Sequence, residues 1–305
     1  MMTRTKKTCI RLYPKIAAFS LLIALLAGCL SRETETLPVV SDYMLCEINE
    51  IRNLRVGVVP GPYWDMFEEA VLPSLEEMGY TATFFYYFDY ASPNFALEQN
   101  EIDLNIFQHY LYLNNFKFEN DLALSAIMEI PTVSMSVFSN HFDTINDVWS
   151  GASVSIPDDA SNLARALRVL EAANMLTLDP SIDKSKATPA NIVSNPHGLV
   201  LVPVRAHELV ESLKSYDMSV INGNYAVSGG LNLSEALYQE VLIENYMNVI
   251  TVRTEDLSKQ FVRDVIEAVY SDSFRDIIAD PAGNYVGFQW PRWLHDIMDM
   301  IEARG

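Results

Sequence analysis

Residues 54–88 read LRVGVVPGPYWDMFEEAVLPSLEEMGYTATFFYYF and predict a strand, a helix and a second strand in succession. Residues 54–59 are a short apolar run that ends in a Pro-Gly-Pro turn. A helix should follow over about 63–78 and end at Gly79, because glycine often stands just after the last helical residue. Residues 81–88 are β-branched and aromatic, as is typical of a strand. This alternation predicts a parallel sheet with right-handed crossover connections.

The same alternation returns in the middle of the chain. Residues 152–157 predict a strand, and Asp158-Asp159-Ala160-Ser161 then supplies residues that cap a helix. That helix should bury an apolar stripe spaced at i, i+3, i+4 and i+7, formed by Leu163, Ala166, Leu167 and Leu170. Further strands are expected at 217–221 and 248–252, and an amphipathic helix around 261–269. The residues therefore predict an α/β fold.

The N-terminus has the pattern of a bacterial lipoprotein signal. Basic residues precede an apolar run over 16–27, which is too short to span a bilayer because that takes about 20 residues. The run closes with Leu26-Ala27-Gly28-Cys29, where small residues would let a peptidase cut before Cys29. We expect a signal peptide at 1–28, palmitate-type lipid on Cys29, an exported protein tied to a membrane of the cell envelope, and a flexible tether at 29–50. An ordinary secretory signal with an incidental cysteine is the alternative.

Composition limits the classes of partner. Without residues 1–28 the chain keeps 277 residues. A single hydrophobic core is usually smaller than that, so we expect two lobes. It then carries 16 Lys and Arg against 40 Asp and Glu, a net charge of −24. A surface this acidic argues against binding to nucleic acid or to anionic lipid.

The sequence gives no indication of catalysis. Neither a Gly-x-Ser-x-Gly nucleophile motif nor a His-Glu-x-x-His metal helix occurs, and the pair His207-Glu208 is isolated. Of the three cysteines, Cys9 leaves with the signal and Cys29 takes the lipid, which leaves Cys46 without a disulfide partner. We therefore expect no enzyme, no metal site and no cofactor.

Six stretches, in this order, resemble the NlpA/MetQ family of methionine-binding lipoproteins. They lie within residues 53–275 and are DYASPNFAL at 89–97, DLNIFQH at 103–109 with Tyr112-Leu113 after it, IPDD at 156–159, NLARAL at 162–167, INGNYA at 221–226 and YMN at 246–248. The resemblance implies a two-lobed periplasmic-binding-protein clamp, type II-like, with the ligand cleft between the lobes. The first lobe would be 53–132 together with 248–305, and the second 133–247. Members are substrate-binding components of ABC importers, which implies L-methionine as ligand and an ABC permease and ATPase as partners.

A free amino acid needs a cation or a helix N-terminus for its carboxylate, oxygens for its ammonium and an apolar pocket for its side chain. Arg165 is the expected carboxylate partner: it lies off the apolar stripe in the first turn of its predicted helix, where N–H donors would help. The resemblance assigns the side-chain pocket to Tyr90, Phe107, His109 and Tyr112, and the head group to Asn162, Asn222 and Asn248. Asn224 is expected in a turn rather than at the ligand.

Each of these residues also has an ordinary structural interpretation. Taken alone, Arg165 could be a surface arginine in a solvated ion pair, and each aromatic residue could belong to the core. His109 could be a core histidine with its hydrogen bonds satisfied, and Asn222 a turn asparagine. The family resemblance favours the ligand site.

Three stretches depart from the family pattern. Residues 134–139 read SMSVFS where the family usually has Pro-Met-Gly before an aromatic-Ser pair, and 195–202 are apolar where a Glu is usual. The C-terminal tail, with Trp290, Trp293 and an apparent extra helix over 294–303, is longer than the family pattern. These departures bear on ligand preference and on the partner-facing surface.

Two alternative functions stay open. One is the same fold binding a methionine-containing peptide or another apolar amino acid, and the other is a surface lipoprotein with a role outside transport.

Overall fold

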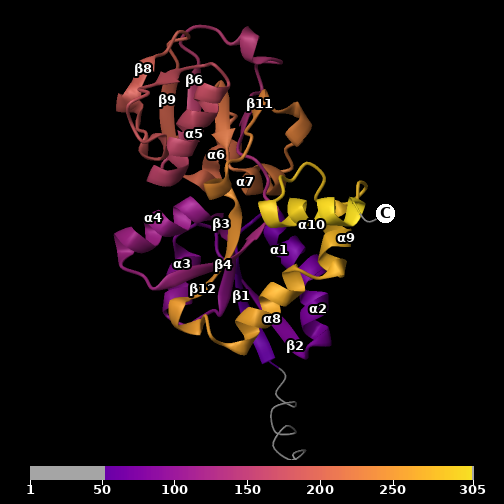
Figure 1. The fold of residues 1–305 in the computed structure, drawn as a ribbon. Helices are drawn as coiled ribbons and strands as arrows, with labels where there is room; N and C mark the ends of the chain where they lie inside the picture. The colour runs from indigo at the N-terminus through magenta and orange to yellow at the C-terminus, as the bar shows by residue number, and fades with distance from the viewer. Residues whose placement is uncertain (1–51, 304–305) are drawn as a thin grey trace, which may run out of the picture. The chain divides into compact units, whose positions relative to one another are not determined.

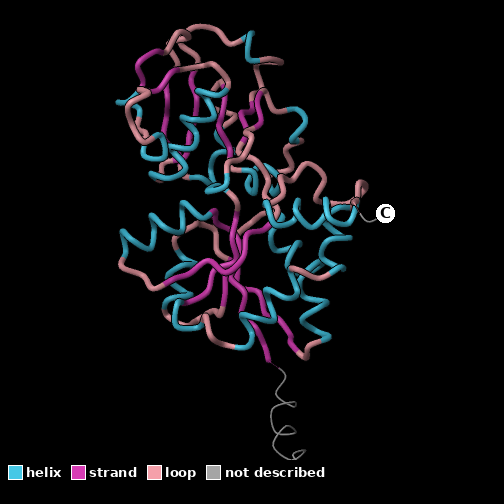
Figure 2. Tube along the Cα trace, in the orientation of Figure 1, coloured by secondary structure: helices cyan, strands magenta, loops and turns pink. Residues whose placement is uncertain are grey.

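The computed structural model describes residues 52–303, so the predicted signal peptide, Cys29, Cys46 and the tether lie outside the described residues. In the described chain the strands form two five-stranded sheets and a small two-stranded one. Figure 2 shows the two large sheets as separate groups of strands, each with helices beside it. The mixed α/β character predicted from the sequence is confirmed.

The first sheet has the strand order β2-β1-β3-β12-β4. Its strands are β1 (Arg52–Val58), β2 (Tyr80–Tyr86), β3 (Leu104–His109), β4 (Leu124–Ile130) and β12 (Asn248–Arg253). Strand β1 pairs in parallel with β2 and β3, which confirms the parallel pairing predicted from residues 54–88. Strand β12 inserts antiparallel between β3 and β4, so the chain returns to this sheet after leaving it.

The predicted helix over 63–78 is present, but a π-helical turn interrupts it. The segment consists of α1 (Pro62–Met66), η2 (Phe67–Val71) and α2 (Leu72–Glu77). Pro73 explains the interruption, because proline has no N–H to donate and its ring would clash with the carbonyl four residues earlier. The helix ends as predicted before Gly79, whose φ of 86° favours glycine.

The second sheet has the order β11-β5-β10-β6-β9. Its strands are β5 (Ser136–Phe138), β6 (Ser153–Pro157), β9 (Val200–Val204), β10 (Met218–Ile221) and β11 (Tyr238–Gln239), and the small sheet pairs β7 (Thr177–Leu178) with β8 (Ile192–Ser194). Strand β6 runs parallel to β9 and β10, whereas β5 is antiparallel to its neighbours. The predicted strands at 152–157 and 217–221 are β6 and β10.

Helices cover both faces of each large sheet (Figure 1). On the first sheet they are α1, α2, α8 (Gln260–Val269) and α9 (Asp272–Ala279) on one side, and α3 (Ser92–Glu98) and α4 (Tyr110–Asn120) on the other. On the second they are α5 (Ala160–Ala172), α6 (Leu209–Ser212) and α7 (Gly223–Ser228). In α5 the predicted stripe is buried at Ala166, Leu167 and Leu170 and partly buried at Leu163. Each large sheet therefore has a buried apolar cluster on each of its two faces.

Two segments carry the chain between the sheets, one from β4 to β5 and one from β11 to β12. The C-terminal tail reaches the first of them, because Thr132 and Gln289 form an antiparallel bridge. The tail then ends in α10 (Arg292–Glu302), the extra helix that the sequence predicted. Within residues 52–303 none of the helices has both the length and the apolar character that crossing a membrane requires.

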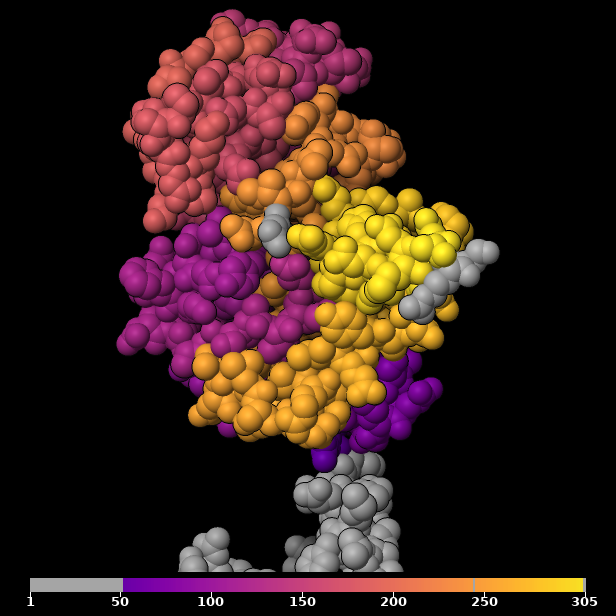
Figure 3. All heavy atoms as spheres, viewed as in Figure 1, coloured from indigo at the N-terminus to yellow at the C-terminus, as the bar shows by residue number. Residues whose placement is uncertain are grey.

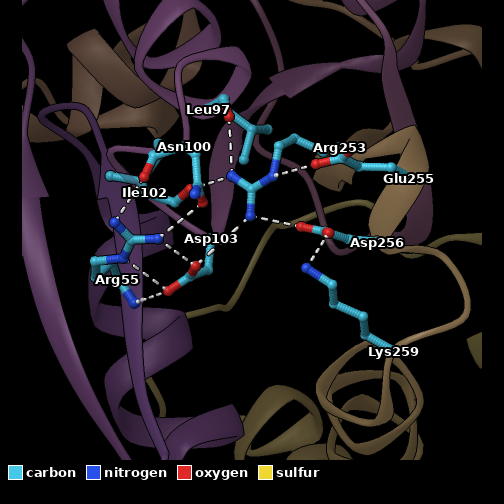
Figure 4. A network of polar contacts seen from close by, with 9 residues as sticks. All are labelled: Arg55, Leu97, Asn100, Ile102, Asp103, Arg253, Glu255, Asp256 and Lys259. Atoms are coloured by element: carbon cyan, nitrogen blue, oxygen red, sulfur yellow. Dashed lines mark hydrogen bonds and ion pairs between the residues drawn. The ribbon is translucent and has the colours of Figure 1, made fainter.

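A buried ionic cluster fastens β12 to its surroundings in the first sheet (Figure 4). Arg253 donates to the carbonyls of Leu97 and Ile102 and forms an ion pair with Asp256 at 2.5 Å. Asp256 is fully buried, and its oxygens are held by ion pairs with Arg253 and Lys259 rather than by aligned hydrogen bonds. All partners of this cluster belong to the first sheet and its connections.

Candidate functional site

A pocket with an empty volume of about 320 Å³ opens where the ends of the two large sheets face each other. All eight residues that the sequence proposed for the ligand line it, namely Tyr90, Phe107, His109, Tyr112, Asn162, Arg165, Asn222 and Asn248. Five more line it as well: Tyr63, Gln108, Val133, Gly223 and Asn224. The structure thus brings the predicted set together, and the role of each residue in binding stays a prediction.

Arg165 projects into this pocket from α5, although not from its first turn. The helix begins at Ala160, so Arg165 lies in the second turn, and the expected location is corrected accordingly. The first turn is already capped, because the Asp159 carboxylate accepts from the Asn162 N–H at 2.9 Å. The helix start is therefore satisfied by the protein itself, and the guanidinium is the main anion-binding group of this helix.

Glu240 holds one edge of the Arg165 guanidinium. Its carboxylate accepts from Nε at 2.9 Å and from Nη2 at 2.6 Å. The remaining nitrogen, Nη1, makes no hydrogen bond within the described chain. The guanidinium carbon also lies 4.9 Å from the ring centre of Tyr246, on which it stacks. Glu240 and Tyr246 thus fix the plane of the guanidinium while leaving donors for a second anion.

Arg165 is almost fully buried, with 4% of its surface exposed. Burial alone would lower the pKa of Arg165, but the ion pair with Glu240 outweighs burial and raises it. The guanidinium is therefore charged at every physiological pH. A buried cation beside a pocket favours a ligand that carries a negative group.

Asn162 and Asn222 form a buried pair at the pocket wall. Asn222 Nδ2 donates to Asn162 Oδ1 at 2.7 Å, and Asn162 Nδ2 donates to both oxygens of Asp159. The Asn222 side-chain oxygen has no hydrogen-bond partner although it is buried. A buried acceptor without a partner is costly, so this atom suits a ligand that brings a donor.

Asn248 begins β12 at the opposite side of the pocket. Its Nδ2 donates to the carbonyl of Phe107 at 3.0 Å, and its main-chain N–H donates to Thr132 Oγ1 at 2.8 Å. The first bond orients the side chain and the second holds the main chain, while Oδ1 makes no hydrogen bond within the described residues. Asn248 thus adds a second acceptor to the pocket lining.

His109 is held in one tautomer by its neighbours. Its Nδ1 accepts from the N–H of Tyr112 at 3.0 Å, which caps α4, so the proton lies on Nε2, 3.3 Å from Asn162 Oδ1. Burial, helped by the charge of Arg165, places the pKa of His109 well below its usual value. The imidazole is therefore neutral at neutral pH. Its ring edge is part of the pocket wall, and both nitrogens are already used by the protein.

Aromatic rings build the apolar end of the pocket. Tyr90 stacks on Phe107 at 5.7 Å between ring centres and contacts Tyr112 edge-on, also at 5.7 Å. Tyr225 of α7 approaches Tyr90, with 5.2 Å between the ring centres. Burial raises the pKa of Tyr90 well above its usual value, so the hydroxyl stays protonated and donates to Asn224 at 2.7 Å. Such a cage suits an apolar, polarizable side chain.

Sequence reasoning missed Glu240 and placed Asn224 wrongly. Asn224 lies in the first turn of α7 rather than in a free turn, and it lines the pocket while bonding to Tyr90 and to the carbonyl of Pro60. The asparagine before it, Asn222, is the residue that precedes α7, so the Asn-Gly pair starts a helix here. Glu240 is the one charged residue in the mainly apolar stretch ALYQEVLI at 236–243, and no local signal pairs it with Arg165.

The arrangement can bind a small zwitterion with an apolar tail. It offers one buried cation, acceptors without partners on Asn222 and Asn248, and an aromatic wall. Among the described residues no group of three or more His, Cys, Asp or Glu side chains is placed to hold a metal ion.

Residues 54–293 match the sequence model of the NlpA lipoprotein family. Outer membrane lipoprotein 3 of Mannheimia haemolytica is 29% identical over 225 residues, which cover 73% of this chain and 85% of that protein. D-methionine-binding lipoprotein MetQ of Yersinia pestis is 28% identical over 227 residues, or 73% of this chain and 83% of that protein. A nutrient binding protein from Burkholderia cenocepacia, solved bound to methionine, is 28% identical with a TM-score of 0.70 over 74% of this chain and 95% of that one. The likeness confirms the two-lobed α/β fold predicted from the sequence.

Proposed function

Because this chain belongs to the NlpA lipoprotein family, we propose that it is a substrate-binding lipoprotein that captures L-methionine between its lobes and delivers it to an ABC importer. One observation carries the proposal: a charged Arg165 and a partnerless Asn222 oxygen line the same pocket. The first complements a carboxylate and the second an ammonium, which are the two charged groups of a free amino acid.

The aromatic wall of the pocket supports methionine as the ligand, because it suits the methionine side chain. A thioether packs well against aromatic edges, and burying a methionine side chain is worth roughly 1.5–3 kcal/mol. The pocket is small and closely lined by side chains, which favours one amino acid over a methionine-containing peptide. In this assignment Tyr90, Phe107, His109 and Tyr112 contact the side chain, while Arg165, Asn162, Asn222 and Asn248 serve the head group.

Delivery needs no catalysis by this chain. Ligand contacts from both lobes would favour the closed state, which the ABC permease, with its ATPase, would recognise. The lipid on Cys29 would hold the protein on the exported side of a membrane in the bacterial envelope. The lobe boundaries belong to the same proposal: 53–132 with 248–305 for the first lobe, and 133–247 for the second.

The test is isothermal titration of the purified protein with L-methionine, after unfolding and refolding have removed any carried ligand. The expected result is 1:1 binding with L-methionine. A methionine-containing dipeptide should bind at least about tenfold more weakly because its second residue needs more room, and L-leucine because its branched side chain lacks the polarizable thioether that packs against aromatic edges. Absence of heat in a protein shown to be folded would overturn the proposal. Tighter binding of the dipeptide than of methionine would move the assignment to a peptide receptor.

A further inference from the structure

Gln289 of the C-terminal tail bonds to both segments that cross between the lobes. Its main-chain O and N pair with N and O of Thr132 at 2.8 and 2.9 Å. Its side-chain Oε1 accepts from the N–H of Leu242 at 2.8 Å, and its Nε2 donates to Ser134 Oγ at 2.6 Å and to the carbonyl of Glu240 at 2.7 Å. Thr132 and Ser134 lie on the outgoing segment, whereas Glu240 and Leu242 lie on the returning one. One residue therefore links the two crossings.

The tail that carries Gln289 is fixed to the first lobe. Tyr285 is 2% exposed and donates to Glu69 at 3.1 Å, and the indole N–H of Trp293 donates to the carbonyl of Glu129 at 3.0 Å. The Phe288 ring packs edge-on against Tyr63, which itself lines the pocket. Figure 3 shows this tail, in yellow, as a continuous patch on the surface. Gln289 thus reaches the crossings from a rigid base.

Glu240 connects the crossings to the pocket. Its main-chain N–H donates to the carbonyl of Met135 at 3.1 Å, and its carboxylate accepts from the Met135 N–H at 3.3 Å. The same carboxylate holds Nε and Nη2 of Arg165. The position of the Glu240 main chain therefore sets the position of the carboxylate, and the carboxylate sets the plane of the guanidinium. Gln289 holds that main chain at the Glu240 carbonyl.

We propose that Gln289 is a positioning residue for carboxylate recognition, because it holds Glu240 where Glu240 orients Arg165 toward the ligand. Gln289 is not among the residues that line the pocket, so it acts through Glu240 and Arg165. This inference rests on the proposed function, since the ligand carboxylate is what Arg165 would bind. It also gives the C-terminal tail a role in binding rather than only in packing.

The experiment compares Gln289→Met with Gln239→Met by titration of the full chain with L-methionine. Gln239 is the last residue of β11, directly before the returning segment, and its side chain donates one hydrogen bond, to the carbonyl of Leu233, outside the path to Arg165. Gln289→Met should weaken L-methionine binding by about tenfold, because it removes the hydrogen bond to the Glu240 carbonyl and leaves Ser134 and the Leu242 N–H without this partner. Gln239→Met should change the dissociation constant by less than about twofold.

A double-mutant cycle separates positioning from general destabilisation. Glu240→Ala removes the carboxylate through which Gln289 would act on Arg165. In this background Gln289→Met should therefore weaken L-methionine binding no further. If Gln289→Met does not fold, Gln289→Glu replaces it, since the carboxylate can still accept from Leu242 but cannot donate to Ser134 or to the Glu240 carbonyl.

The possible failures are distinguishable. A wild-type protein that does not bind L-methionine contradicts the proposed function itself. A wild type that binds, with Gln289→Met and Gln239→Met giving equal affinity, overturns the role of Gln289. An equal tenfold loss in the Glu240→Ala background overturns it too, because the effect would then not pass through Glu240.

Discussion

Arg253 and Arg165 are both buried and both paired with carboxylates, yet only Arg165 lines a pocket. They are 5% and 4% exposed, respectively. Arg253 is surrounded by groups of the first sheet and its connections: carbonyls at 2.9 and 2.5 Å, Asp256 at 2.5 Å and Asp103 at 3.6 Å (Figure 4). Arg165 has one carboxylate partner, Glu240, and an Nη1 group that makes no hydrogen bond within the described chain.

The difference shows that burial and ion pairing do not identify a binding arginine. Both features occur at Arg253, where every neighbour is part of the fold and none faces a pocket. The informative feature at Arg165 is the pocket beside its unused donor, because Arg253 Nε also lacks a hydrogen bond but Arg253 does not line the pocket. Within the pocket, an unused polar atom also separates Asn222, with its partnerless oxygen, from Asn162, whose oxygen accepts from Asn222.

The largest expected effect is on stability, at Arg253. Arg253→Met removes the cation but leaves Asp256 fully buried beside Lys259 alone, which should cost about 3–5 kcal/mol of unfolding free energy. Urea unfolding measures the loss. The dissociation constant for L-methionine, measured on the folded fraction, should stay within about twofold, because the cluster does not line the pocket.

The control for this variant is Arg263→Met on α8, an exposed arginine that bonds to Ser258 and Gln260. It should change the unfolding free energy by less than about 0.5 kcal/mol. Equal losses of unfolding free energy in the two variants would mean that the buried cluster stabilises the fold no more than an exposed arginine does. The proposed structural role of Arg253, and with it the contrast to Arg165, would then be wrong.

The second effect is on binding, at Arg165. Arg165→Lys keeps the charge but loses the planar fork that Glu240 orients, so L-methionine should bind about 100-fold more weakly by titration calorimetry. Arg168 is a matched control on the same helix, since its guanidinium lies 5.0 Å from the ring centre of Tyr246 without lining the pocket.

Arg168→Lys should weaken binding by less than about threefold, because it removes no group that faces the ligand. Similar losses in the two lysine variants would show that any cation beside Tyr246 suffices. That result would remove the distinction between an arginine that lines the pocket and one that does not.

The third prediction concerns Asn222, whose side-chain oxygen lacks a hydrogen-bond partner. Asn222→Ala removes the acceptor proposed for the ligand ammonium and should weaken L-methionine binding by about tenfold. The matched ligand is 4-(methylthio)butanoate, which lacks the ammonium. Its affinity should be the same for wild type and variant, whereas a tenfold loss for both ligands would mean that Asn222 shapes the pocket without recognising the ammonium.

The smallest effect concerns pH. Burial and Arg165 lower the pKa of His109 in the folded state, so below about pH 6.5 the unfolded chain binds this proton while the folded one does not. His109 therefore contributes stability that is present above pH 6.5 and decreases as the pH falls, with a slope of up to about 1.4 kcal/mol per pH unit. Unfolding of wild type and His109→Asn across pH 5 to 8 measures it.

The variant should lose less stability than wild type between pH 7 and 5, since asparagine does not titrate. Parallel stability curves for the two proteins would contradict a neutral, buried His109. Affinity for L-methionine in the wild type should not change between pH 7 and 8, because His109 is already neutral there and Arg165 stays charged.

Much of the fold could be predicted because its signals are local. The strands at 54–59 and 152–157, the Asp159 cap and the stripe on α5 depend on residues only a few positions apart. The π-helical turn before Pro73 was missed, although a proline inside a helical pattern gave the warning. The pocket residues came from the family resemblance, and the structure brings all eight to one place.

The sequence by itself determined the α/β alternation, the helix caps and the family, because each depends on neighbouring residues or on a recurring order of motifs. Only the tertiary structure decided which buried arginine lines the pocket. It also paired Arg165 with Glu240, 75 positions away, and joined Gln289 to Ser134, 155 positions away. Such pairings depend on how separate elements pack, and side-chain charges carry no information about distant partners until the chain is folded.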